Sequence, residues 1–115
     1  QGKTSMQFAP SSEAHAEHRH PVVIRHPETG EKVLFVNRTY ALRIEGYDAE
    51  RSERLLKELF LHSVSEPFRY RLQWRPHMLT IWDNRSTQHL AVNDYQGHRR
   101  DMYRTTAVGT ALEAA

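Results

Sequence analysis

The sequence predicts a mostly β domain that carries a single helix, and three observations lead to this fold class. Two β-branched runs, at 22–24 and 33–36, are separated by turn-forming residues. Residues 68–74 alternate strictly between large apolar and polar side chains, which is the period of a strand. Only the segment 48–66 repeats apolar residues at helical spacing. Two strands, one helix and three further strands fit half of a β-sandwich or barrel.

The first two strands are expected to form a hairpin. The connecting residues 27–30 read Pro-Glu-Thr-Gly, and Pro and Gly supply the backbone angles that a turn needs. Residues 1–19 are poor in large apolar side chains, so we expect a flexible N-terminal segment there. The small residues of 110–115 predict a tail.

The helix is expected to begin at Asp48. This carboxylate can cap free amides of the first turn, and Glu50 and Glu53 place negative charge near the positive end of the helix dipole. Pro67 should end the element, because the residue before a proline avoids helical angles. Four apolar residues share one face of this helix, namely Leu55, Leu56, Leu59 and Phe60.

Three strand-like runs are expected after the helix, at 68–74, 78–82 and 100–108. In the first run, Arg69 and Arg71 lie on one face, which we expect to be solvated or ion-paired. The opposite face is predicted to be core and consists of Phe68, Tyr70, Leu72 and Trp74.

Composition argues against several classes of protein. The 115 residues carry 16 Lys and Arg against 14 Asp and Glu, and this net charge of +2 is too mild to indicate a nucleic-acid binder. The absence of cysteine excludes a disulfide scaffold and a thiolate zinc site. No apolar run approaches the roughly 20 residues that span a bilayer, and no signal-peptide stretch is present. We therefore expect a cytoplasmic protein with neither a membrane nor a nucleic-acid partner.

The most informative polar residues lie near the C-terminal end. His89 is followed by Arg100 and Arg104, and the turn-forming residues 93–97 lie between them. If the chain is a strand from residue 100, both arginines point to one face and the turn brings His89 onto a neighbouring strand. A histidine beside two guanidinium groups suits a metal ligand next to anion-binding side chains, since arginine holds a carboxylate through two parallel hydrogen bonds.

Several unusual short motifs surround these residues. Residues 82–89 read Trp-Asp-Asn-Arg-Ser-Thr-Gln-His, and residues 26–30 read His-Pro-Glu-Thr-Gly. The remaining motifs are His20-Pro21-Val22-Val23, Leu34-Phe35-Val36-Asn37, Asn93-x-Tyr95 and Arg99-Arg100-x-Met102-x-Arg104.

In this order and spacing, the motifs closely resemble the C-terminal half of the taurine dioxygenase (TauD/TfdA) family. Members of that family are iron(II)- and 2-oxoglutarate-dependent dioxygenases. The resemblance implies that residues 20–109 are the C-terminal part of the dioxygenase domain, and that they form the C-terminal portion of a double-stranded β-helix, or jelly-roll, fold.

The resemblance also implies roles for four residues. His89 corresponds to the distal histidine of the family's two-histidine, one-carboxylate iron site. Arg100 corresponds to the arginine that pairs with 2-oxoglutarate, and Arg104 to the arginine that holds the anionic head of the primary substrate. Tyr40 corresponds to an aromatic residue that lines the substrate pocket. The implied reaction uses molecular oxygen to hydroxylate a small anion such as a sulfonate, sulfate ester or carboxylate, in an enzyme that is a homo-oligomer when intact.

One part of the family pattern is missing. The other two iron ligands form a His-x-Asp motif upstream, and this sequence contains none. His15-x-Glu17 and His26-x-Glu28 have suitable chemistry, but they lie outside the pattern. We therefore interpret the chain as the C-terminal portion of a longer enzyme, inactive alone. The alternative is a catalytically silent domain that binds a small anion or a protein partner through Arg100 and Arg104.

Overall fold

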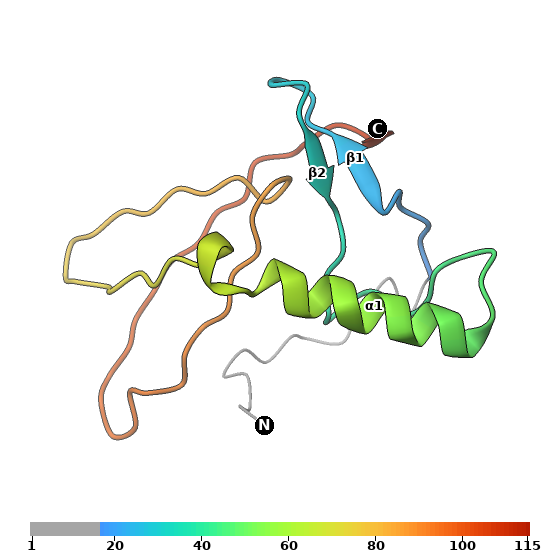
Figure 1. Ribbon diagram of the computed structural model, residues 1–115. Helices are drawn as coiled ribbons and strands as arrows, with labels where there is room; N and C mark the ends of the chain where they lie inside the picture. The colour runs from blue at the N-terminus through green and yellow to red at the C-terminus, as the bar shows by residue number, and fades with distance from the viewer. Residues whose placement is uncertain (1–16) are drawn as a thin grey trace.

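The computed structural model describes residues 17–115, so the residues expected to form a flexible N-terminal segment lie largely outside the described part (Figure 1). Its regular elements are few and short. In chain order they are β1 (Val23–Arg25), β2 (Lys32–Leu34), α1 (Ala49–Ser63), the 3₁₀ turn η2 (Glu66–Phe68) and β3 (Glu113–Ala114).

The three strands form one antiparallel sheet in the order β2-β1-β3. The hairpin prediction is confirmed, since Ile24 of β1 lies opposite Val33 of β2. The connecting loop closes with the His26 amide donating to the Glu31 carbonyl, and Gly30 adopts the positive φ of 75° that a glycine tolerates. On its other side, Ile24 lies opposite Ala114. Part of the expected tail is therefore a strand.

The predicted helix and its N-cap are confirmed. The Asp48 carboxylate accepts a hydrogen bond of 2.8 Å from the Arg51 amide. On the inner face, Leu56 is buried and the buried Ser52 hydroxyl accepts from the Ile44 amide, which holds the preceding loop on the helix. Helix α1 ends at Ser63, and Pro67 follows within η2.

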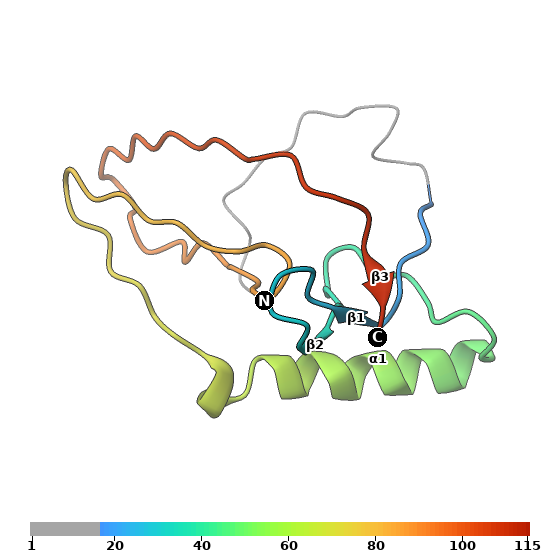
Figure 2. The same ribbon diagram turned by 90° about the horizontal axis from the view of Figure 1, so that it is seen from above.

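The three strands predicted after the helix, at 68–74, 78–82 and 100–108, are wrong as hydrogen-bonded strands. The chain makes turns near residues 75–78 and 95–98, yet no ladder joins its extended runs within residues 17–115. These runs extend beyond the C-terminal end of α1 and then return toward the sheet, where the last run leads into β3 (Figure 2). Strand-like side-chain alternation does not make a strand unless another strand supplies backbone donors and acceptors.

Most apolar side chains of these runs are exposed, contrary to the predicted core face, of which Leu72 alone is half-buried. Phe68, Tyr70 and Trp74 are all exposed, and Leu79 and Ile81 remain 85% and 87% exposed. The described core is small and consists of Ile24, Val36 and Leu56. The expected core face therefore lacks the second layer that would bury it.

Two global measures agree with a loosely packed chain. The accessible surface is 11222 Å² for a mass of 13.5 kDa, whereas a compact monomer of this mass exposes about 6,500 Å². The radius of gyration is 16.3 Å, compared with about 13 Å for a compact domain of this length.

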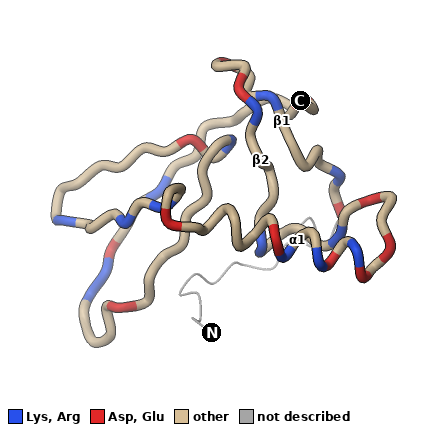
Figure 3. The backbone as a smooth tube through the Cα atoms, viewed as in Figure 1, with Lys and Arg blue, Asp and Glu red and all other residues tan. Residues whose placement is uncertain are grey.

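Charged residues interleave along both α1 and the extended runs (Figure 3). The expected ion-paired face of the first run is confirmed, because Arg69 lies 3.4 Å from Glu66 and Arg71 lies 3.7 Å from Asp94. No helix in the described part is long and apolar enough to cross a membrane.

The exposed apolar runs predict that the 115-residue chain self-associates in solution. Sedimentation velocity at rising concentration should show species larger than a monomer. Replacing Leu79 and Ile81 by serine should reduce the association, because this removes two of the most exposed apolar side chains. The matched control is Leu61→Ser, which removes an exposed apolar group from α1 instead. A monomer with one sharp calorimetric unfolding transition would contradict this prediction.

Candidate functional site

His89 lies just after a tight turn formed by residues 83–87. The Asp83 carbonyl accepts hydrogen bonds from the amides of Ser86 and Thr87, at 3.3 and 3.0 Å. It also accepts a 2.6 Å bond from the Thr87 hydroxyl. The side chain and backbone of Thr87 thus close the turn two residues before His89.

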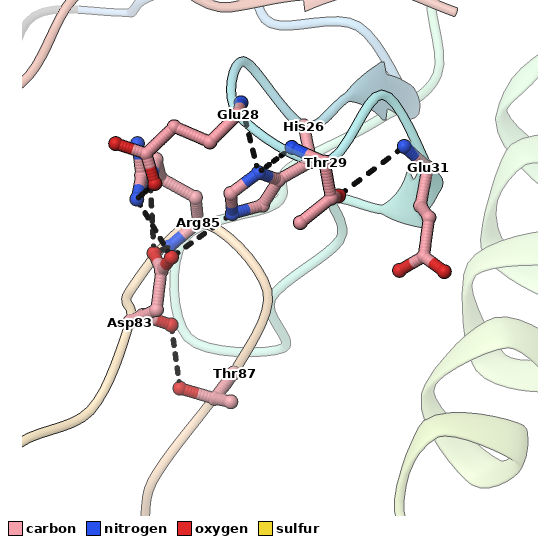
Figure 4. A network of polar contacts seen from close by, with 7 residues as sticks. All are labelled: His26, Glu28, Thr29, Glu31, Asp83, Arg85 and Thr87. Carbon is pink, nitrogen blue, oxygen red and sulfur yellow. Dashed lines mark hydrogen bonds and ion pairs between the residues drawn. The ribbon is translucent and has the colours of Figure 1, made fainter.

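The Asp83 carboxylate is the centre of a polar cluster that consists of His26, Glu28, Asp83 and Arg85, called here the Asp83 cluster (Figure 4). One carboxylate oxygen accepts from the Arg85 amide and Nε, at 2.9 and 2.8 Å. The other accepts from an Arg85 terminal nitrogen at 2.8 Å and from His26 Nε2 at 2.9 Å. The same guanidinium lies 3.1 Å from Glu28. Four donors therefore saturate one carboxylate.

The hydrogen bonds of His26 fix its tautomer. Its Nδ1 accepts from the amides of Glu28 and Thr29, each at 3.2 Å, so the proton of the neutral ring is on Nε2. That N–H donates to Asp83, which is 57 residues away in sequence. The residue is only 6% exposed, and its ring joins the β1–β2 hairpin to the turn before His89.

The contacts within the Asp83 cluster shift the pKa values of Asp83 and Arg85. Hydrogen bonds from the Arg85 side chain, then from His26, then from the Arg85 amide, hold the pKa of Asp83 well below its usual range. Conversely, the hydrogen bond to Asp83 raises the pKa of Arg85 above its already high value. The pair is therefore ionised throughout the physiological pH range.

The other polar residues of the 82–89 motif also have partners. Trp82 Nε1 donates to Asn84 at 2.9 Å, and the Trp82 ring lies 4.9 Å from the His89 ring, between centroids. The side-chain Nε2 of Gln88 donates to the backbone carbonyl of Val36, just after β2. The motif is thus a turn that Asp83, Arg85 and Gln88 attach to the hairpin region, and it presents an exposed imidazole at residue 89.

The four residues assigned from the resemblance are all exposed. The Arg100 guanidinium lies 5.0 Å from the centre of the Tyr95 ring. Tyr40 is 69% exposed, and Arg104 is exposed in the last extended run. Within residues 17–115, no hydrogen bond or ion pair joins His89, Arg100, Arg104 and Tyr40 to one another. Their assigned roles remain predictions.

The described donor set is not a complete iron site. No group of three or more His, Asp or Glu side chains in residues 17–115 is arranged to hold a metal ion. His89 offers one ligand of the required type. His26 cannot supply another without losing its contacts, because both of its ring nitrogens already have partners. His15, of the alternative pair with Glu17, lies outside the described residues.

Sequence reasoning missed the Asp83 cluster. From the sequence, His26 is considered only in the pair His26-x-Glu28 outside the ligand pattern, and Asp83 has no predicted role. The motifs at 26–30 and 82–89 place polar residues beside turn formers, which was the only signal in the sequence. A contact across 57 residues has no local pattern by which a single sequence would reveal it.

Comparison with known proteins identifies the family. Residues 1–106 match the family described as "Taurine catabolism dioxygenase TauD, TfdA family", and the chain belongs to it. The resemblance seen in the motifs is thereby confirmed.

Three relatives show how much of such a protein the chain covers. It is 45% identical over 89 residues to an alpha-ketoglutarate-dependent dioxygenase, cnsM, of Penicillium expansum, covering 76% of this chain and 25% of that protein. It is 42% identical over 100 residues to an alkylsulfatase of Acinetobacter baylyi, covering 86% and 31%. It is 41% identical over 80 residues to an alpha-ketoglutarate-dependent sulfonate dioxygenase of Saccharomyces cerevisiae, covering 69% and 19%. The chain thus spans less than a third of each relative, and no solved structure gave a significant match.

The ionisation of Asp83 gives a prediction about pH. Its pKa is depressed in the folded chain. Its contacts therefore stabilise the fold fully above the unfolded pKa of about 3.9, and this effect is lost as pH falls from there through the folded pKa. Carbon-13 NMR of the labelled carboxyl should show a titration well below the ordinary aspartate range. In Arg85→Gln the pKa of Asp83 should rise, because the strongest hydrogen-bond donors to the carboxylate are lost.

The matched control for this titration is Arg69→Gln, which removes an exposed ion pair with Glu66 and should leave the Asp83 titration unchanged. The description of the cluster would be contradicted if Asp83 titrated in the ordinary range, or if Arg85→Gln did not move it.

Proposed function

We propose that the chain is the C-terminal portion of an iron(II)- and 2-oxoglutarate-dependent dioxygenase with a double-stranded β-helix fold. The observation that carries this proposal is the 82–89 turn, which presents the exposed imidazole of His89 within a chain of the TauD/TfdA family. In this reading, the exposed apolar face of residues 68–74 packs against β-strands supplied by the remainder of the enzyme.

His89 would be one of three iron ligands, and the other two would come from outside the described residues. When bound, iron and 2-oxoglutarate supply the oxidation of a substrate carbon. The chain's own contribution is to orient the ligands and anions. Arg100 would pair with the distal carboxylate of 2-oxoglutarate, since a guanidinium matches a carboxylate through two parallel hydrogen bonds.

The proposed primary substrate is a small anion such as a sulfonate, a sulfate ester or a carboxylate. Arg104 would hold its anionic group, and Tyr40 would line the pocket beside it. Arg104 makes no ion pair within residues 17–115, so its guanidinium is available to an anion. The names of two relatives, a sulfonate dioxygenase and an alkylsulfatase, support this substrate class.

A second candidate function is a catalytically silent domain that binds an anion or a protein through Arg100 and Arg104. It is favoured by the finding that no group of three or more His, Asp or Glu side chains in residues 17–115 is arranged to hold a metal ion. The full-length sequence separates the two candidates, because a His-x-Asp motif on an upstream strand supports the enzyme and its absence supports the binding domain.

We predict that the 115-residue chain alone binds iron(II) weakly, since His89 lacks two partner ligands. Anaerobic titration with iron(II) and 2-oxoglutarate should produce little of the charge-transfer absorption that chelation gives. The full-length enzyme should produce it, and His89→Ala should abolish it there. If the chain alone gave strong absorption that His89→Ala removed, the site would be complete within these residues and the proposal would be wrong.

In the full-length enzyme, replacing Arg100 and replacing Arg104 should weaken the binding of different ligands. Losing a buried bidentate pair typically costs about 2–5 kcal/mol. Arg100→Ala should therefore weaken 2-oxoglutarate binding by roughly 30-fold or more, with little effect on the primary substrate at saturating cosubstrate. Arg104→Ala should weaken binding of the primary substrate, with little effect on 2-oxoglutarate binding. Lysine at either position should rescue only partly, because it keeps the charge but not the planar fork.

Separate saturation curves for the two ligands in both variants provide the measurement. Arg99→Ala is the matched control, because Arg99 pairs with Asp101 and is proposed to touch neither ligand. An unchanged primary-substrate curve in Arg104→Ala would refute the anionic substrate while leaving the dioxygenase assignment intact.

A further inference from the structure

His89 lacks direct support of its own. Its side chain is exposed, and within residues 17–115 no hydrogen bond fixes the imidazole, which contacts the ring of Trp82. A metal ligand must nevertheless be held in place, because small displacements weaken coordination. The support must therefore come through the backbone that leads to it.

That backbone is fixed through Asp83. The Asp83 carbonyl closes the turn through Thr87, and the Asp83 side chain attaches the turn to the hairpin through His26. Arg85 adds a second connection, because it holds Asp83 at 2.8 Å and reaches Glu28 at 3.1 Å. His89 thus follows a turn that is attached to β1 and β2 through charged hydrogen bonds, which are stronger than neutral ones.

The Asp83 carboxylate and the His26 ring are already saturated by protein partners. Each carboxylate oxygen of Asp83 accepts two hydrogen bonds, and each ring nitrogen of His26 has a hydrogen-bond partner. These groups have no free position for iron, 2-oxoglutarate or substrate. Any contribution to the site must therefore be made by holding another residue in place.

We propose that His26, Asp83 and Arg85 are positioning residues for the iron site, and that their hydrogen bonds set where His89 meets the metal. This inference rests on the proposed function. The hairpin holds the turn in place, and the turn positions His89, whose own side chain is exposed. Loss of the cluster should displace the turn from the hairpin and leave the Gln88–Val36 hydrogen bond as the remaining attachment.

The test is metal binding by the full-length enzyme, measured without turnover. Anaerobic titration with iron(II) at saturating 2-oxoglutarate gives the apparent dissociation constant and the position of the charge-transfer band. Asp83→Ala should weaken iron binding by roughly 10-fold or more and shift the band, as loss of groups that orient a metal ligand generally does. His26→Ala should have a similar effect.

Two further variants separate positioning from stability. His26→Gln keeps a side-chain N–H that can donate to Asp83, so it should restore much of the iron affinity lost in His26→Ala. Asp48→Ala removes the N-cap carboxylate of α1, which makes no contact with the turn. It should lower the melting temperature while the iron affinity and the band of the folded enzyme stay unchanged.

The outcomes distinguish this inference from the proposed function. If His89→Ala retains the charge-transfer band, the proposed function fails and the positioning role fails with it. If His89→Ala abolishes the band while Asp83→Ala leaves affinity and band unchanged, only the positioning role is overturned. It is also overturned if Asp48→Ala weakens iron binding as much as Asp83→Ala does.

Discussion

The carboxylate of Asp83 is the interaction on which the arrangement of this chain depends. It collects four hydrogen bonds, three from Arg85 and one from the buried His26. Because His26 follows β1 and Asp83 opens the turn before His89, this charged group joins the hairpin to the C-terminal half of the chain, where the Gln88–Val36 hydrogen bond and the β1–β3 pairing add further links. An ionised carboxylate with four donors holds such a join firmly, since each bond is charge-assisted.

The apolar packing of the chain is sparse by comparison with these polar contacts. Strands of two and three residues form the sheet, and a sheet of this size is marginal without a layer packed on it. The runs after η2 carry strand-like alternation and large apolar side chains, yet no backbone ladder joins them within residues 17–115. In the proposed enzyme, further strands would pair with this exposed backbone and cover residues such as Leu79 and Ile81.

What the sequence predicted correctly was local. The hairpin followed from β-branched runs around a Pro-Gly segment, and the helix from the cap at Asp48, because neighbouring residues determine both. The later strands were predicted from alternation, but their formation depends on partners that the alternation does not specify. His89 and the arginines came from the family resemblance. The His26–Asp83 contact could not be predicted, since neither residue's neighbours indicate a partner 57 positions away.

Under the proposed function, the extended runs at 69–74, 78–82 and 100–108 are β-strands whose partners come from outside residues 17–115. Amide hydrogen exchange, compared between the 115-residue chain and the full-length protein, tests it most directly. In the chain alone, amides of β1, β2 and α1 should exchange more slowly than those of residues 69–112, which have few backbone partners. In the full-length protein, residues 69–112 should become protected as well. Equally fast exchange of that segment in both proteins would contradict the proposed pairing of these runs with further strands.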